Sequence, residues 1–192
     1  MLNILLSGVG GQGTVLASKI IAKSAIMRGE TAHTAETIGM AQRGGCVVSH
    51  VRLGKDAYSP LIPLGQADVI IGFEPAEAVR VLPYLKKGGT VIVNSSPIKP
   101  VTDSLTKTSY DAEPFIDYLK KQDISAVVID GAKITAECGS AKVLNVALLG
   151  AAAAMGVIEI TSAELEHIIN TALPEKFREL NLKAARLGAA SI

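Results

Sequence analysis

The stretch "GVGGQGTVLASKI", residues 8–20, decides the fold: four of its first six residues are glycines, and an apolar run at residues 2–6 precedes it. An apolar run, then glycines, then a helical pattern predict a strand, a tight turn and a helix. Gly8, Gly10 and Gly13 fit the GxGxxG spacing, in which small residues let backbone N–H groups and a helix N-terminus face an anion. The residues expected at this binding turn are Gly8, Gly10, Gly11, Gln12, Gly13 and Thr14.

A dinucleotide-binding fold is one interpretation of this turn, because Glu36 follows the second predicted strand where an acidic residue would bind a ribose. That fold needs a second helix after the second strand. The sequence instead continues with "TIGMAQRGGCVVSHVRLG", residues 37–54. Its glycines indicate a loop, and the alternation over residues 47–53 predicts a half-buried strand of the kind that is often antiparallel. The missing helix argues against a dinucleotide-binding fold, whereas the glycine spacing and Glu36 favour it. A self-contained NAD(P)-binding oxidoreductase is therefore the alternative hypothesis and not the leading one.

The rest of the chain alternates between strand and helix patterns, which is typical of α/β proteins with a parallel-rich sheet covered on both faces. We expect a three-layer α/β/α architecture with a Rossmann-like start, a mixed, mostly parallel sheet and a helical C-terminal third, in one domain over residues 1–192. The predicted strands are 3–7, 31–35, 47–53, 69–72, 90–94 and 126–130, and the predicted helices are 13–28, 75–82, 113–121, 141–155, 162–171 and 175–187.

Local signals mark the helices of the C-terminal third. Residues 143–149 leave little polar face, so their helix should be buried. Thr161 and Glu164 have the spacing of a capping box. Pro174 suits the first turn of the last helix, and Gly188 suits its end.

Composition narrows the classes of function. The chain has 192 residues, is 48% hydrophobic, carries a formal net charge of +1 and contains no Trp. Without a basic tract or aromatic platform, nucleic acid is not an expected partner. The longest apolar run, residues 146–158, is too short to span a bilayer, and the first residues lack a signal-peptide pattern, so we expect no membrane partner and a cytoplasmic location. Cys46 and Cys138 are too few to hold zinc or an iron–sulfur cluster, so no metal site is expected in this chain.

A second informative stretch is the loop at residues 40–45. Gln42 can donate and accept hydrogen bonds, and Arg43 carries a planar fork suited to carboxylate or phosphate. Gln42 and Arg43 are therefore candidates for the rim of a catalytic site. A surface loop with a solvated arginine is the alternative interpretation. His50, on the predicted strand that follows, is a third candidate for this rim, although a structural hydrogen bond is the more common role for such a histidine. Four further residues of the loop are expected to contact a partner or substrate, namely Met40, Ala41, Gly44 and Gly45.

Five stretches, in this order, carry a family resemblance: "GVGGQGTVLAS", "GMAQRGGCVVSHVRLG", "YSPLIPLGQADVIIGFEPAEAVR", "GGTVIVN" and "AKVLNVALLGA". They resemble the gamma subunit or domain of the 2-oxoacid:ferredoxin oxidoreductases. The combination of Met-Ala-Gln-Arg-Gly-Gly with Ser-His-Val-Arg is most similar to the small subunit of the indolepyruvate type. The resemblance covers nearly the whole chain and is weaker across residues 95–125.

The resemblance implies oxidative decarboxylation of an aryl 2-oxoacid with coenzyme A, which yields an acyl-CoA, carbon dioxide and reduced ferredoxin. In that family the large subunit carries thiamine diphosphate, Mg²⁺ and the iron–sulfur clusters, so none is expected on this chain alone. Coenzyme A is the candidate shared ligand. The partners implied are the large catalytic subunit and, through the complex, ferredoxin. This chain is then a subunit that should be inactive alone.

Two further residues are candidates for the same site. Glu74 and Asn94 end successive predicted strands, and the carboxyl ends of parallel strands meet at one edge of a sheet. We therefore place them with the glycine turn and the 40–45 loop, as a rim that closes on the partner's cofactor and contacts coenzyme A phosphates. Helix-start or turn chemistry is the alternative for Glu74 and Asn94. A regulatory or scaffolding module of the same fold is the third functional hypothesis.

Overall fold

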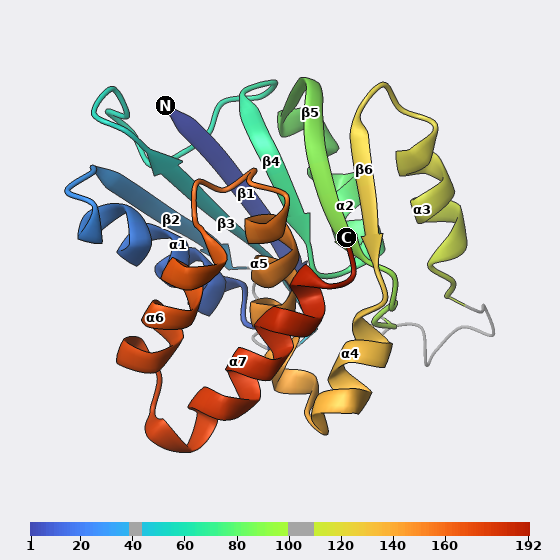
Figure 1. Cartoon of the computed structure of the whole chain (residues 1–192). Coiled ribbons are helices and arrows are strands. Elements are labelled where there is room, and N and C mark those ends of the chain that lie inside the picture. The colour runs from blue at the N-terminus through green and yellow to red at the C-terminus, as the bar shows by residue number, and fades with distance from the viewer. Residues whose placement is uncertain (39–43, 100–109) are drawn as a thin grey trace.

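The computed structural model describes residues 1–38, 44–99 and 110–192. Within these residues six strands form one sheet in the order β2-β3-β1-β4-β5-β6 (Figure 1). Each predicted strand is present. Their bounds are β1 Leu2–Val9, β2 Ala32–Ile38, β3 Cys46–Leu53, β4 Ala67–Gly72, β5 Leu85–Asn94 and β6 Ser125–Ile129.

The sheet is mixed and mostly parallel, as predicted. β1 pairs parallel with β4, β4 with β5, and β5 with β6, whereas β3 is antiparallel to both of its neighbours, β1 and β2. The carboxyl ends of β1, β4, β5 and β6 therefore lie at the same edge of the sheet. Ligands of open α/β sheets bind outside this edge.

The insertion of β3 between β1 and β2 bears on the dinucleotide hypothesis. Ser49 of β3 is paired with Leu6 of β1 on one side and with Glu36 of β2 on the other. Two strand spacings, roughly 10 Å, therefore separate Glu36 from β1. A dinucleotide fold places its second strand directly beside the first. Glu36 instead accepts a hydrogen bond from Ser18 Oγ (3.3 Å).

Helices cover both faces of the sheet, which confirms the three-layer architecture (Figure 1). α1 and α5 pack on one face, with α6 and α7 outside them, while α2 and α3 pack on the other. The helices and 3₁₀ turns are α1 Thr14–Met27, α2 Pro75–Arg80, η1 Leu82–Tyr84, α3 Glu113–Lys120, α4 Gly131–Cys138, η3 Ala141–Val143, α5 Leu144–Ala154, α6 Ser162–Ala172 and α7 Glu175–Ala189. In the part of the chain described, no helix is long and apolar enough to cross a membrane.

The packing of α5 under α7 corrects one prediction. α5 is buried all round, as its sequence predicts. Gly188 does not end α7, because the helix runs on to Ala189. A Cβ on Gly188 would collide with the carbonyl group of Ala147, and one on Gly150 with that of Ala185. These two glycines therefore let the backbones of α5 and α7 approach closely, and the helix-end interpretation of Gly188 was wrong.

Helix α4 was not predicted, although its end signals are present in the sequence. The side chain of Asp130 caps the helix by accepting from the N–H of Lys133 (3.0 Å), and Gly139 follows the helix in the left-handed conformation at φ 71°. These are the standard N-cap and C-terminal signals. The predicted capping box of Thr161 and Glu164 is confirmed at the start of α6.

Candidate ligand-binding site

The glycine turn lies at the carboxyl end of β1 and is fastened to the start of β3. The N–H of Gly10 donates to the carbonyl of Gly45 (2.8 Å), so the turn and the end of the 40–45 loop lie in contact, as predicted for these two stretches. Gly8 has no room for a side chain, because a Cβ there would lie 2.7 Å from Gln12 Oε1 and 2.8 Å from the Cβ of Phe73. Close approach of neighbouring groups explains this glycine.

Helix α1 begins directly after the turn with its first N–H groups uncapped by any side chain. Gly13 is the N-cap residue, in the left-handed conformation at φ 83°, and it makes no side-chain cap bond because it has no side chain. Thr14, the last predicted residue of the binding turn, is buried at the start of the helix. An uncapped N-terminus carries a partial positive charge and attracts anions.

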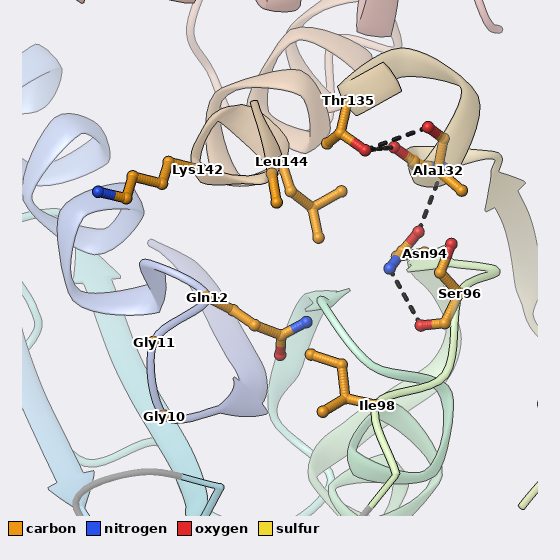
Figure 2. Close-up of a pocket in the computed structure, with 12 residues that line it drawn as sticks. Gly10, Gly11, Gln12, Asn94, Ser96, Ile98, Ala132, Thr135, Lys142 and Leu144 are labelled. Atoms are coloured by element: carbon orange, nitrogen blue, oxygen red, sulfur yellow. Dashed lines mark hydrogen bonds between the residues drawn. The ribbon is translucent and has the colours of Figure 1, made fainter. Parts of the chain in front are cut away.

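A pocket of about 430 Å³ opens beside this helix N-terminus. We call it the carboxyl-edge pocket. Figure 2 shows the glycine turn and Lys142 toward one end, and Asn94, Ser96, Ala132 and Thr135 toward the other. Its lining residues are Gly10, Gly11, Gln12, Asn94, Ser96, Ile98, Gly131, Ala132, Thr135, Ala141, Lys142 and Leu144.

The pocket combines cationic and apolar groups. Lys142, a lining residue at one end of the pocket, carries a positive charge, and the turn that lines the same end leads into the N-terminus of α1. Ile98 and Leu144 supply apolar surface. The volume falls in the range of small-molecule sites, roughly 300–1,000 Å³. Such a lining suits an anionic ligand that also has an apolar part.

Gln12 and Asn94 reach the pocket as predicted, but their amide groups are used inside the protein. Gln12 Nε2 donates to the carbonyl of Phe73 (2.8 Å), and its Oε1 accepts from the N–H of Val9 (2.7 Å). Asn94 Nδ2 donates to the carbonyls of Phe73 (3.0 Å) and Ser96 (3.2 Å), and its Oδ1 accepts from the N–H of Gly131 (3.2 Å). Both residues therefore shape the pocket rather than offer free amides to a ligand.

Glu74 lies at the same edge of the sheet but does not line the pocket. The residue is 1% exposed, and its carboxylate accepts from the N–H of Glu77 (3.0 Å), as the N-cap of α2, and from the hydroxyl of Tyr110 (2.6 Å). Burial and the bond to Glu74 raise the pKa of Tyr110, so its hydroxyl remains a donor. The helix-start alternative is what the structure shows for Glu74.

His50 is not brought to the pocket. It lies on the face of the sheet that α2 covers, where its Nδ1 accepts from the N–H of Ile62 (3.2 Å). Its ring meets that of Tyr84 edge to face, with centroids 5.7 Å apart. Burial lowers the pKa of His50, which favours the neutral form that this acceptor role requires.

Two of the predicted contact residues, Met40 and Ala41, and two of the rim candidates, Gln42 and Arg43, lie outside the described residues. Gly44 and Gly45 are described, and Gly45 makes the bond to Gly10. Sequence reasoning missed several lining residues, because they come from segments distant in the sequence. A glycine directly after a strand end, Gly131, and a lysine just before a buried helix, Lys142, were the available signals.

Comparisons with known proteins agree over the whole chain. A family model described as pyruvate ferredoxin/flavodoxin oxidoreductase matches residues 3–191. The chain is 37% identical to the indolepyruvate oxidoreductase subunit IorB of Thermococcus kodakarensis, over 97% of this chain and 93% of that one. It resembles the gamma subunit of a keto/oxoacid ferredoxin oxidoreductase from Geobacter sulfurreducens, with a TM-score of 0.71 and 26% identity over 100% of this chain and 98% of that one. It also matches 30% of a 2-oxoglutarate:ferredoxin oxidoreductase chain from Magnetococcus marinus, solved with 2-oxoglutarate, coenzyme A and succinyl-CoA bound (TM-score 0.72, 20% identity, 99% of this chain).

Proposed function

Because the chain belongs to the pyruvate ferredoxin/flavodoxin oxidoreductase family, we propose that it is the small subunit of a thiamine-diphosphate-dependent 2-oxoacid:ferredoxin oxidoreductase that acts on indolepyruvate or another aryl pyruvate. The complex would decarboxylate the 2-oxoacid, transfer the acyl group to coenzyme A and pass the electrons to ferredoxin. The indolepyruvate relative supports this choice of substrate class.

The role proposed for this chain is to bind coenzyme A at the carboxyl-edge pocket. The observation that carries it is that one pocket is lined both by Lys142 and by the glycine turn that leads directly into the uncapped N-terminus of α1. Two such cationic groups suit the phosphates of coenzyme A, and the apolar wall suits a less polar part of the molecule. A structure from Magnetococcus marinus that was solved with coenzyme A shares this fold over 30% of its chain, which makes coenzyme A the ligand to test.

The reactive cofactors are proposed to lie on the large subunit. The donor chemistry described in this chain does not fit an iron–sulfur cluster: the two cysteines stand apart, Cys46 at the start of β3 and Cys138 at the end of α4. Burial raises the pKa of the Cys46 thiol to about 11, which disfavours the thiolate that metals require. In residues 1–38, 44–99 and 110–192, no group of three or more His, Cys, Asp or Glu side chains could hold a metal ion.

Residues of the 40–45 loop would complete the site from the side of β3. The bond between Gly10 and Gly45 fixes the end of this loop against the glycine turn. We propose that Arg43 pairs with a carboxylate or phosphate, that Gln42 hydrogen-bonds, and that Met40 packs against the substrate or the large subunit. Thiamine diphosphate supplies the decarboxylation chemistry when bound to the partner, while this chain binds and orients coenzyme A.

The test is the KM for coenzyme A in the complex co-expressed with its large subunit. Lys142→Ala should raise this KM about tenfold or more, since a charge-assisted contact is worth about 1.5–3 kcal/mol. Lys120→Ala, at an exposed position in the last turn of α3, is the matched control and should leave it unchanged. An unchanged KM in Lys142→Ala would refute this binding site and would favour a scaffolding role.

Two measurements on the chain alone test the wider proposal. It should show no oxidation of indolepyruvate when supplied with thiamine diphosphate, Mg²⁺, coenzyme A and ferredoxin, because the reactive cofactors are assigned to the partner. Calorimetric titration with NAD and NADP should show no tight binding. A dissociation constant at or below about 10 µM, equivalent to roughly −7 kcal/mol, would favour the nucleotide-dependent alternative.

A further inference from the structure

Asn145, in the first turn of α5, lies behind the carboxyl-edge pocket and is 2% exposed. Its Nδ2 donates to the carbonyl of Gly13 (3.3 Å), and its Oδ1 lies 2.8 Å from the N–H of Val146, which donates to it. The first of these bonds joins residues 132 positions apart in the sequence. A buried amide thus connects the C-terminal helices to the glycine turn.

The two ends of this connection adjoin two segments of the pocket lining that are distant in the sequence. Lys142 and Leu144, just before Asn145 in the chain, line the pocket from η3 and α5. Gly13 is the last residue of the glycine turn, and the residues just before it, Gly10–Gln12, line the pocket at the end of β1. Contact at this point is tight, because a Cβ on Gly13 would lie 2.5 Å from Asn145 Nδ2. The side chain of Asn145 therefore links the turn before α1 to the segment that carries Lys142.

We propose that Asn145 is a positioning residue that holds the N-terminus of α1 and Lys142 in the arrangement that binds a phosphate group. This inference rests on the proposed function for the identity of the ligand, but not for the linkage itself. Asn145 does not line the pocket, so it acts on a ligand through Gly13 and Lys142.

The local hydrogen bonds predict how a variant should behave. The carbonyl of Gly13 also accepts from the N–H of Ala17 (3.0 Å), which is the first bond of α1. Loss of the Asn145 amide therefore leaves that bond of α1 in place and removes the contact that holds the turn from outside. The effect should fall on the affinity for coenzyme A more than on the formation of the helix.

The experiment compares Asn145→Ala and Asn145→Asp with Asn181→Ala. Asn181 is the matched control, because it is a buried asparagine whose Nδ2 also donates to a backbone carbonyl, that of Phe177 (2.8 Å), and it does not line the pocket. Two readouts are taken on the co-expressed complex: the kinetic constants for coenzyme A, and amide hydrogen exchange of the peptide over residues 9–17 without ligand.

Both Asn145 variants should raise the KM for coenzyme A about five- to tenfold with kcat within about twofold, and should speed exchange in the 9–17 peptide; Asn181→Ala should do neither. Asn145→Asp keeps the size of the side chain but places an acceptor against the Gly13 carbonyl, so it tests the bond if Asn145→Ala does not assemble. Unchanged exchange in Asn145→Asp would overturn the positioning role. Faster exchange with unchanged KM, together with an unchanged KM in Lys142→Ala, would refute coenzyme A binding while the linkage stands.

Discussion

Gln12 and Asn94, which come from the turn after β1 and the end of β5, donate to the same acceptor. The carbonyl oxygen of Phe73 receives Gln12 Nε2 at 2.8 Å and Asn94 Nδ2 at 3.0 Å, while the N–H of Phe73 donates to the carbonyl of Ser7 (2.8 Å). Three neighbouring strand ends, those of β1, β4 and β5, are thereby fastened at one residue. This bonding fixes the base of the carboxyl-edge pocket before any ligand binds, and such preorganisation lowers the cost of binding.

The shared carbonyl predicts a non-additive pair of substitutions. Gln12→Leu or Asn94→Leu alone leaves one donor on Phe73, whereas the double variant leaves this carbonyl without either. The loss of unfolding free energy in the double variant should therefore exceed the sum of the single losses by about 0.5–3 kcal/mol, as measured by chemical denaturation. Asn94→Leu combined with Gln122→Leu, at a half-buried residue after α3 whose Nε2 donates to the carbonyl of Tyr118, should be additive. Additivity in both pairs would show that the shared acceptor is unimportant.

Gly13 and Gly29 provide a second matched pair. Both have left-handed backbones, at φ 83° and 79°, but a Cβ would lie 2.5 Å from Asn145 at Gly13 and would meet nothing within 4 Å at Gly29. Gly29→Ala should cost about 1–2 kcal/mol of unfolding free energy, through backbone strain. Gly13→Ala should cost about 1–3 kcal/mol more, through overpacking. Equal costs in thermal or chemical unfolding would contradict the contact between Gly13 and Asn145.

The strands and the sheet edge could be predicted because their signals are local. Residues 2–6 and 47–53 show the apolar and alternating patterns that strands require, and the missing helix after residue 36 indicated that the dinucleotide fold is interrupted. The hydrogen-bond partners of individual polar side chains could not be predicted from such local patterns. Whether Asn94 or Glu74 faces a ligand or a backbone group depends on Phe73, Gly131 and Tyr110, which only the folded chain brings near.

The dependence on residues distant in the sequence also explains why the prediction for Gly188 was wrong. Gly188 has the sequence signal of a helix end, but its role is set by Ala147 on another helix. The sequence around residue 188 contains no signal that predicts the contact between α5 and α7. Helix α4 is as long as α3, which was predicted, but Ile134 is its only buried residue with a side chain, so no apolar periodicity marks it.

His50 gives a pH-dependent prediction. Burial lowers the pKa of His50 in the folded state below its ordinary value of about 6.5. The unfolded chain then binds more protons as the pH falls, so the stability from neutral His50 is fully present above about pH 6.5 and is lost as the pH falls through the folded pKa. His50→Asn retains an acceptor for the N–H of Ile62 but cannot titrate. It should flatten the decrease of unfolding free energy as the pH falls below about 6.5, and an unchanged pH profile would exclude His50 as its source.

The last prediction concerns Arg43, two residues before the carbonyl that Gly10 binds. In the reconstituted complex, Arg43→Ala should lower turnover substantially and leave the unfolding free energy of this chain unchanged. A guanidinium that pairs with a desolvated carboxylate or phosphate is worth about 2–5 kcal/mol, whereas a solvated arginine is worth within about 0.5 kcal/mol. Arg43→Lys should rescue turnover only in part, because an ammonium keeps the charge but loses the planar fork. Subunit affinity is measured beside the rate, since the same substitution could act on assembly. Wild-type turnover together with wild-type assembly in Arg43→Ala would show that the loop is a structural connection, with no part in the site.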